Sequence, residues 1–213
     1  MTPQSPPDDH LPPALLEAMA LRAGTRSFPA HAILINEGDT TDSLYIVRSG
    51  RLQVYASSED GRTVVLAELG PGEYLGELAL DHEKRSASVK ALEASTCLVV
   101  QGAQLREFLA EHPDFALHLA RKLMHMVRRL TEQVRSLALQ DVYGRIARVL
   151  MELSDAVGNE RVLRQKLTQQ DIANRVGSSR EMVNRVMKEL TTGGYVGLRE
   201  GRLVIQRKLP AAW

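Results

Sequence analysis

Cysteine is almost absent from the 213-residue chain, and so are long apolar runs. The single cysteine, Cys97, cannot form an internal disulfide. It also cannot supply the several thiolates that a structural zinc site or an iron–sulfur cluster takes. No apolar run approaches the roughly 20 residues that cross a bilayer. We therefore expect no membrane association, no metal centre and no cluster-based redox sensor.

The first residues lack the basic start and the apolar stretch of a secretory signal. Five of the nine prolines fall within the first 13 positions, which is typical of a solvated tail. We therefore expect residues 1–13 to be a disordered tail, and we expect the protein to act in the cytoplasm.

Catalytic constellations are also missing. We find no pairing of a nucleophile with a base, no metal-ligand spacing and no P-loop, so the sequence offers no candidate catalytic residues. An enzyme is therefore not expected.

The net charge of +1 hides an uneven distribution of charge. Residues 1–140 contain 14 basic and 18 acidic side chains, whereas residues 141–213 contain 13 basic and 8 acidic ones. A basic C-terminal part favours a polyanionic partner, because each neutralised phosphate releases bound counterions. Charge imbalances of this size also occur on solvated surfaces, so the charge distribution alone does not establish a polyanionic partner, and the sequence motifs are needed as further evidence.

The region from about residue 28 to residue 100 is β-rich. Glycine-containing dipeptides such as Asp60-Gly61 and Pro71-Gly72 supply the positive or fixed φ that tight turns require. Strands are predicted over 44–47, 52–55, 64–69, 87–91 and 96–100. An amphipathic stretch over 12–21 precedes them, with prolines suited to the first turn of a helix.

A heptad pattern replaces the strand pattern between residues 114 and 139. Its spacing of 3 and 4 predicts a parallel two-helix dimer seam, in which one polar residue can fix the register. The seam consists of Ala116, Leu119, Leu123, Met126, Leu130, Gln133 and Leu137. A second stripe beside it lets the helix contact both its own β domain and a partner, and comprises Ala120, Met124, Val127, Thr131 and Val134. The alternative is a buried core helix in a monomer.

A helix-turn-helix is predicted in the C-terminal region. Thr168 and Asp171 resemble an N-cap and its acidic partner, and Gly177 breaks the first helix. The expected elements are a helix over 142–156, a loop at 158–159, helices over 169–176 and 180–190, and a hairpin of 195–198 with 202–206. Ser178 or Ser179 can cap the second helix of the motif.

The packing positions of this motif are all filled by apolar or small residues. Ala173 is small where the second helix crosses it, and Gly177 suits the left-handed turn. The packing residues are Ile172, Ala173, Val176, Val183 and Val186. Two helices joined by a tight turn without nucleic acid remain the alternative.

The outward residues of the second helix have the chemistry of base readout. An arginine fork matches guanine O6 and N7, and a carboxylate accepts from cytosine N4, so Arg180, Glu181 and Arg185 are the expected readers. A surface salt bridge between Glu181 and Arg185 is the alternative. The full set of expected DNA contacts is Gln169, Gln170, Ser178, Ser179, Arg180, Glu181, Asn184, Arg185 and Lys188.

A second motif carries the chemistry of phosphate and ribose recognition. Glu77 can accept from a ribose hydroxyl, while Arg85 and Ser86 can bind a single phosphate together with local N–H groups. The motif residues are Gly76, Glu77, Leu78 and Ala79, followed after the tract 81–84 by Arg85, Ser86 and Ala87. A β-turn and short helix joined by an Arg–Glu salt bridge fits the same residues.

From about residue 22 to residue 208 the chain resembles the bacterial family of the cyclic AMP receptor protein and the fumarate–nitrate reduction regulator (Crp/Fnr). The resemblance rests on the motif around Glu77 and Arg85, on Ser179-Arg180-Glu181 with Arg185, and on residues 139–147. It implies an α+β fold with a jelly-roll-like β-roll for an effector (14–112), a dimerisation helix (113–139) and a winged helix-turn-helix (140–213).

The resemblance implies a homodimeric transcription regulator, typically an activator, that binds palindromic double-stranded DNA and works with RNA polymerase. It implies a cyclic nucleotide as effector, most simply cAMP, with Leu130 and Thr131 near the base. Leu130 stands where the cyclic AMP receptor protein has a hydroxyl residue, and the tract 81–84 is shorter. The alternatives are an effector-independent regulator of the same family and a nucleotide-binding module that acts on a protein partner.

Overall fold

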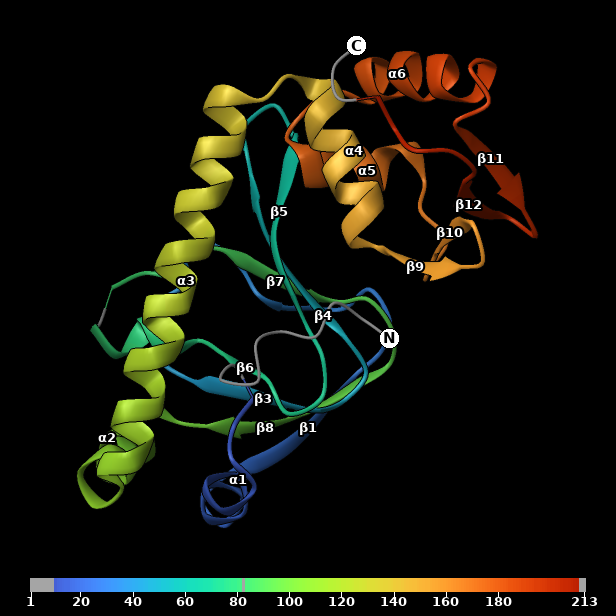
Figure 1. Cartoon of the computed structure of the whole chain (residues 1–213). Coiled ribbons are helices and arrows are strands. Elements are labelled where there is room, and N and C mark those ends of the chain that lie inside the picture. Colours follow the sequence, from blue (N-terminus) through green and yellow to red (C-terminus); the bar gives the residue numbers. More distant parts are fainter. Residues whose placement is uncertain (1–9, 82, 211–213) are drawn as a thin grey trace. The chain divides into compact units, whose positions relative to one another are not determined.

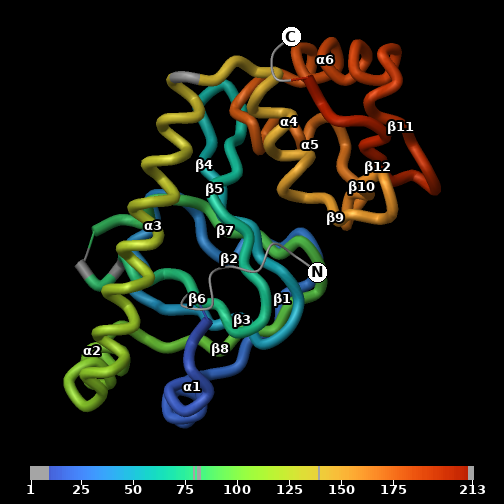
Figure 2. The backbone as a smooth tube through the Cα atoms, viewed as in Figure 1, coloured from blue at the N-terminus to red at the C-terminus, as the bar shows by residue number. Residues whose placement is uncertain are grey.

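The computed structural model describes residues 10–81 and 83–210. They fall into two compact units, which divide the sequence between Val127 and Arg128. The division lies inside the longest helix, α3 (Pro113–Leu139). Figure 1 labels the elements, and Figure 2 follows the backbone through them. Each unit is described by itself below.

The N-terminal unit contains two four-stranded antiparallel sheets, ordered β1-β8-β3-β6 and β2-β7-β4-β5. Its strands are β1 (Gly24–Phe28), β2 (Ile33–Ile35), β3 (Leu44–Ser49), β4 (Leu52–Ser57), β5 (Thr63–Leu69), β6 (Tyr74–Leu75), β7 (Ser88–Ala91) and β8 (Ser95–Val100). Its helices are α1 (Pro13–Ala20), the 3₁₀ helix η2 (Glu77–Asp81), α2 (Gly102–Glu111) and the first part of α3. Two facing sheets of this kind form the expected jelly-roll-like β-roll.

The central strands β3 and β8 of the sheet β1-β8-β3-β6 are buried on both faces, whereas β1 is mostly exposed. The alternation of side chains along β3 explains how both faces are covered. Tyr45 and Val47 of β3 face the second sheet and share a core with Leu52 and Val89. Leu44 and Ile46 point the other way, because successive side chains of a strand alternate. They join a second core with residues of α1, α2 and α3, namely Leu15, Met19, Leu105, Phe108 and Phe115. Helices therefore cover the outer face of this sheet.

Cys97 lies in β8, on the face toward the second sheet, and is fully buried. Burial raises the pKa of its thiol to about 11. The group is therefore protonated at neutral pH, and it packs as a small apolar side chain.

The predicted strands of the β-roll are all present, with ends that shift by one or two residues. The strands β1, β2 and β6 and the helix α2 were not predicted, because they are short or lack a clear period. The prediction of a tail was wrong for its last residues. Leu11 is buried, and its N–H donates to the Gly72 carbonyl at 2.9 Å, so the chain is fixed before α1 begins. Residues 1–9 lie outside the described part.

The C-terminal unit consists of a three-helix cluster and a four-stranded antiparallel sheet ordered β11-β12-β10-β9. After the end of α3 it comprises α4 (Val142–Glu152), β9 (Ser154–Val157), β10 (Glu160–Leu163), α5 (Gln169–Val176), α6 (Arg180–Thr192), β11 (Val196–Arg199) and β12 (Arg202–Ile205). One core joins them, with Ile146, Leu150, Leu163, Ile172, Val183 and Leu190 at its centre. This is the expected winged helix-turn-helix.

The helix predicted over 142–156 is shorter than expected. It ends at Glu152, and the chain continues as β9, which pairs with β10 in register Val157 to Glu160. Gly158, expected in a loop, has φ +61° and makes the tight turn of this hairpin. Strand β10 also pairs with β12, so the wing hairpin β11–β12 is part of a four-stranded sheet.

Within the described ranges, no helix is long and apolar enough to cross a membrane. The described side chains also include no group of three or more histidine, cysteine or acidic residues placed to hold a metal ion.

We predict that Gly177→Ala lowers the free energy of unfolding by about 1–2 kcal/mol, because an L-residue pays for the left-handed conformation. Gly177 has φ +62°, and an added Cβ would lie 3.2 Å from Leu137 Cδ2. Gly158→Ala is the matched control, because Gly158 has φ +61° and no neighbouring atom within 4 Å. Chemical denaturation followed by circular dichroism should show a larger loss of unfolding free energy for Gly177→Ala than for Gly158→Ala. Equal losses would mean that the Leu137 side chain moves aside without a cost in free energy.

Candidate functional site

The connection between β6 and β7 begins with a tight turn at Gly76. This residue has φ +95°, in the region that favours glycine. An added Cβ would lie 2.6 Å from the Ser43 carbonyl oxygen and 2.9 Å from Arg85 Nη1. The turn therefore needs glycine so that the Arg85 guanidinium can approach the backbone. We call this segment, from Gly76 to Ala87, the cassette.

The Arg85 side chain is buried beneath the turn and is held by the chain itself. Its Nε donates to Thr41 Oγ1 at 3.0 Å, its Nη1 to the Gly76 carbonyl at 3.2 Å and its Nη2 to the Ser43 carbonyl at 2.7 Å. Burial lowers the pKa of Arg85, an effect that Tyr45 and nearby acidic groups oppose. The guanidinium stays charged, because its ordinary pKa is far above neutrality. Each guanidinium nitrogen thus has a protein acceptor in this structure.

Glu77 is buried and forms an ion pair with a residue that the sequence did not suggest. Its Oε2 lies 3.3 Å from Lys122 Nζ, and the two side chains are only 5% and 8% exposed. Lys122 also donates to the Tyr74 carbonyl, and its Nζ lies 3.6 Å from the centroid of the Tyr74 ring. The expected alternative of a salt bridge between Glu77 and Arg85 is therefore wrong, because the carboxylate pairs with the lysine of α3.

A signal for Lys122 exists in the sequence, although the heptad pattern obscured it. Phe115, His118 and Lys122 follow each other at spacings of 3 and 4 and are all buried. They form the face of α3 that packs on the N-terminal unit, next to the predicted seam. A lysine in such a row needs a buried acceptor, and Glu77 is that acceptor.

The other residues expected to bind the effector are not buried with Glu77 and Arg85. Ser86 and Leu78 are exposed, Ala87 is half-buried and Ala79 lies in η2, while His82 in the tract 81–84 lies outside the described residues. Leu130 and Thr131 belong to the C-terminal unit and are exposed. The structure thus brings Gly76, Glu77 and Arg85 together, and the roles of the remaining residues stay predictions.

The helix-turn-helix has the local chemistry that the sequence indicated. Thr168 and Asp171 form a reciprocal capping box at the start of α5. Gly177 ends this helix in the left-handed conformation, with φ +62° and ψ +49°. Ser179, rather than Ser178, caps α6 by accepting from the Met182 N–H at 3.2 Å. All five packing positions are buried, so the orientation of α6 on α5 is fixed by the core.

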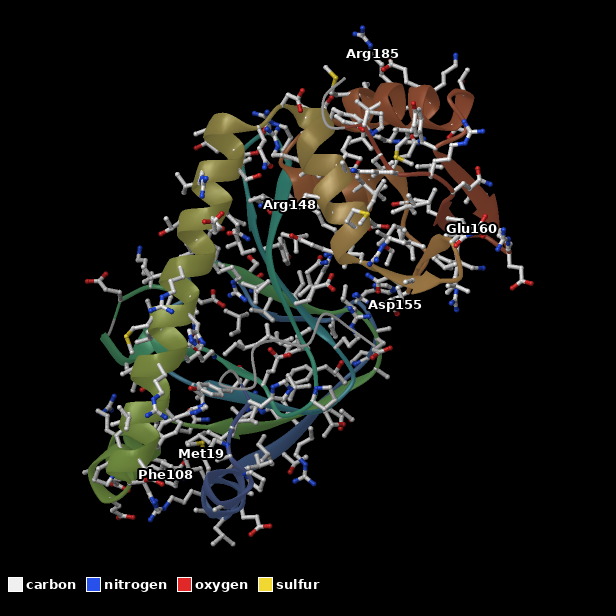
Figure 3. All side chains as sticks on the ribbon, viewed as in Figure 1. Met19, Phe108, Arg148, Asp155, Glu160 and Arg185 are labelled. Atoms are coloured by element: carbon white, nitrogen blue, oxygen red, sulfur yellow. The ribbon has the colours of Figure 1, made fainter. Side chains whose placement is uncertain are left out.

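The expected reading residues project from the exposed side of α6. Arg180, Glu181, Asn184, Arg185 and Lys188 are all exposed. A hydrogen bond from its own backbone N–H, and another from the Ser179 hydroxyl, lower the pKa of Glu181, which is therefore a carboxylate acceptor at neutral pH. Figure 3 shows Arg185 pointing outward from the helix.

Two side-chain contacts restrain residues on the exposed face of α6. Arg185 Nε lies 3.6 Å from Glu189 Oε1, so the expected alternative of a pair between Arg185 and Glu181 is not the one that forms. The reason is that both carboxylates are one turn away, and Glu181 is already engaged at the N-terminus of the helix. Gln169 Nε2 donates to Asn184 Oδ1 at 3.0 Å, which joins the start of α5 to the middle of α6. Gln170 bonds to Asn174 instead.

Helix α3 has an exposed apolar stripe that is centred one position away from the predicted seam. Leu119 packs on the core of its own unit, and Leu123, Met126 and Gln133 are half-buried. Only Ala116, Leu130 and Leu137 of the predicted seam are exposed. The most exposed apolar side chains are those of Val127 and Val134, at 62% and 65%, which belong to the second stripe. The exposed stripe is shifted from the predicted seam because Phe115, His118 and Lys122 occupy the face of α3 that packs on the rest of the N-terminal unit.

Comparison with known proteins agrees with both motifs. The family model for a cyclic nucleotide-binding domain matches residues 25–112, and the model for a Crp-like helix-turn-helix domain matches residues 144–209. The cAMP-activated global transcriptional regulator CRP of Salmonella typhimurium is 31% identical over 183 residues, which are 84% of this chain and 87% of the relative. The cAMP-activated global transcriptional regulator Vfr of Pseudomonas aeruginosa is 30% identical over 198 residues, 89% and 92% of the two chains.

Solved structures show the same arrangement of elements. The c-di-GMP-responsive global regulator CLP of Xanthomonas campestris has a TM-score of 0.83 and 26% identity, over 92% of this chain and 99% of that one. A CooA mutant from Carboxydothermus hydrogenoformans, with a TM-score of 0.75 and 22% identity over 89% and 86% of the two chains, shares the fold. The models for a cyclic nucleotide-binding domain and a Crp-like helix-turn-helix domain match on either side of the long helix α3, and the chain belongs to the Crp/Fnr family of transcription regulators.

Proposed function

We propose that this protein is a homodimeric, sequence-specific DNA-binding regulator whose affinity for DNA is set by a cyclic nucleotide bound at the cassette. The observation that carries the DNA-binding part is the exposed polar face of α6, which starts at the cap residue Ser179. Such a helix enters the major groove with its N-terminal residues near the base edges. The roles assigned here are binding roles, not catalytic ones.

Arg180, Glu181 and Arg185 carry the proposed base readout. An arginine can donate two hydrogen bonds to guanine, and the Glu181 carboxylate can accept from cytosine. The contact between Gln169 and Asn184 supports this assignment, because it restrains side chains beside the readers. Gln170, Ser178, Ser179 and Lys188 are proposed to contact the DNA backbone, which positions the helix but does not read sequence.

A second copy of the chain is proposed to cover the exposed stripe of α3. An apolar stripe of this length on a helix is costly in water, and a parallel two-helix seam would bury it. The seam proposed here is centred on Met124, Val127, Leu130, Val134 and Leu137, all of which are exposed. A two-fold axis along α3 would present two α6 helices to a palindromic site, with half-sites about 34 Å apart.

The effector is proposed to be cAMP. The cyclic nucleotide-binding model covers the cassette, and the relatives from Salmonella and Pseudomonas are described as cAMP-activated. Glu77 offers an acceptor for a ribose hydroxyl, and Arg85 with Ser86 offers donors for one phosphate. Leu130 and Thr131 are proposed to contact the base. RNA polymerase is the proposed protein partner, and the cytoplasm the proposed place of action.

One observation favours a second candidate, an effector-independent regulator of the same family. Each guanidinium nitrogen of Arg85 already has an acceptor in the chain, and Glu77 is paired with Lys122. In this second candidate the contacts of Arg85 and Glu77 only stabilise the fold, and the affinity for DNA is high without a nucleotide. The alternative of a module that acts on a protein partner is less well supported, because it leaves the exposed face of α6 without a role.

Replacing Arg180 with alanine should cost about 1–3 kcal/mol of specific binding and relax the preference for one base. Lys188→Ala is the comparison, because loss of a phosphate contact weakens binding to every sequence alike. Fluorescence anisotropy with specific and random duplexes at stated salt measures both. Equal losses on the two duplexes for Arg180→Ala would reassign this residue to the DNA backbone.

Arg85→Leu and Ser86→Ala should each abolish or greatly weaken cAMP binding and the cAMP-stimulated part of DNA binding, leaving basal binding in place. The reason is that both remove donors for the phosphate. Arg48→Ala, an exposed cation of the neighbouring strand β3, is the control. Calorimetry with cAMP, cGMP and c-di-GMP gives the measurement. If none of the three binds and DNA affinity is already high, the effector-independent candidate replaces the first.

Val127→Glu together with Val134→Glu should give monomers in sedimentation analysis and abolish specific DNA binding. A carboxylate in the seam would meet its own copy across the two-fold axis. Both valines are exposed in the single chain, so its fold should tolerate the change. Arg121→Glu, on another exposed part of α3, should leave the dimer intact. Persistence of the dimer in the double variant would refute the proposed interface.

A further inference from the structure

The C-terminal unit has a groove that belongs neither to the cassette nor to the exposed face of α6. It lies between α4, the start of β10 and the segment that follows β12, and its volume is about 490 Å³. Four of its lining residues are cationic, namely Arg148, Arg161, Arg207 and Lys208. None of the described residues that line it is acidic. The groove is therefore a concave surface with charge of one sign.

The remaining lining of the groove is largely apolar, and the core of the unit holds it in place. Leu209 packs against that core, next to Met151 of α4 in the groove lining. The Tyr143 hydroxyl donates to the Pro210 carbonyl at 2.9 Å, which fastens the segment 206–210 to α4. The groove is thus formed before anything binds, as small-molecule sites usually are. Its apolar lining residues are Ala147, Met151, Ile205, Leu209 and Pro210.

Three of the four cations have no ion-pair partner among the described residues. Arg161 is held by neutral acceptors, since its Nε donates to Ser154 Oγ at 2.9 Å and its Nη2 to the Ser154 carbonyl at 2.6 Å. Arg207 and Lys208 are exposed, and their side chains form neither a hydrogen bond nor an ion pair within the described ranges. Their charges therefore remain available to an anion in the groove.

Acidic side chains that are close in sequence are engaged by other arginines. Glu160 Oε2 lies 2.9 Å from Arg199 Nη2, and Asp155 Oδ1 lies 3.0 Å from Arg164 Nε. Neither Arg199 nor Arg164 lines the groove. These carboxylates thus neutralise charges outside the groove.

Arg148 of α4 (Figure 3) brings an unsatisfied donor to the groove. Its Nε is shielded from solvent and has no hydrogen-bond acceptor in the described part of the chain. Glu152 Oε1, one turn along the helix, lies 3.7 Å away, which is too far for a hydrogen bond. A shielded donor without an acceptor is unfavourable. Because the side chain is 36% exposed, a small rotation would bring its guanidinium onto an anion in the groove.

We propose that this groove is a second ligand site, which binds a small amphipathic anion: an apolar chain or ring that ends in a carboxylate or a phosphate. The head group accepts hydrogen bonds from Arg148, and Arg207 and Lys208 add their attraction. The apolar part covers Met151 and Leu209, which a DNA backbone would leave uncovered. The inference goes beyond the proposed function and does not depend on a nucleotide at the cassette.

Calorimetry on the intact protein tests the chemistry of the ligand. Octanoate and octyl phosphate are the probes, and the tighter one identifies the head group. Acetate has the charge without the chain, and octanol has the chain without the charge. Each should bind about tenfold or more weakly than the better probe, because the groove needs both parts of the ligand.

Variants locate the site. Arg148→Gln should weaken binding of the better probe about tenfold or more, because it removes a charged donor. Arg207→Gln combined with Lys208→Gln should weaken it too, and both residues are exposed, so the fold should tolerate the change. Arg202→Gln removes an exposed cation that does not line the groove and should have no effect. Thermal unfolding checks that each variant folds.

Four results would overturn the proposal. Neither probe binds to the wild type, or the probes bind with the same affinity to the wild type and to the groove variants, which would place them elsewhere. Acetate or octanol may also match the better probe, in which case only one part of the ligand is recognised. Loss of probe binding in Arg85→Leu would assign the probe to the cassette. None of these results bears on the proposed binding of DNA or of a nucleotide.

Discussion

The packing of the Tyr74 ring against α3 is the contact on which the arrangement of the N-terminal unit depends. Tyr74 is the first residue of β6, an edge strand of the sheet β1-β8-β3-β6, and it is fully buried. Its ring lies against Phe115 and His118, and Lys122 covers its face. The chain turns at Gly76, two residues after Tyr74, so the cassette begins beside the contact between β6 and α3. A binding event at Glu77 is therefore never far from the helix that carries the proposed dimer interface.

Much of this fold could be predicted from the sequence, and the failures have physical reasons. Turn dipeptides and alternating residues located five strands, and Thr168, Asp171 and Gly177 located the helix-turn-helix, because local chemistry fixes these elements. The short strands β1, β2 and β6 depend on partners that are distant in sequence, so no local period marks them. The end of α4 was placed too late for the same reason, since pairing of β9 with β10 takes over the residues after Glu152.

The site was predictable as a set of residue types but not as a set of contacts. The sequence placed Glu77 and Arg85 in one motif, yet Lys122, Thr41 and Ser43, which contact them, come from other parts of the chain. Only the tertiary structure brings these atoms together. On α6, by contrast, the exposed residues follow from helical spacing alone, because the buried positions of the motif fix which face is outside. The α3 stripe lies between these cases: the spacing revealed two candidate faces, and burial of Phe115 and Lys122 distinguishes them.

The burial of Cys97 makes the protein convenient for spectroscopic work. Its thiol is enclosed between the two sheets and protonated at neutral pH, so maleimide reagents, which require an accessible thiolate, should react with it very slowly. Cysteines introduced on the surface could then be labelled without removing the native one. A spin label or fluorophore on each of the two units would report their separation, with and without nucleotide, in an otherwise unmodified chain.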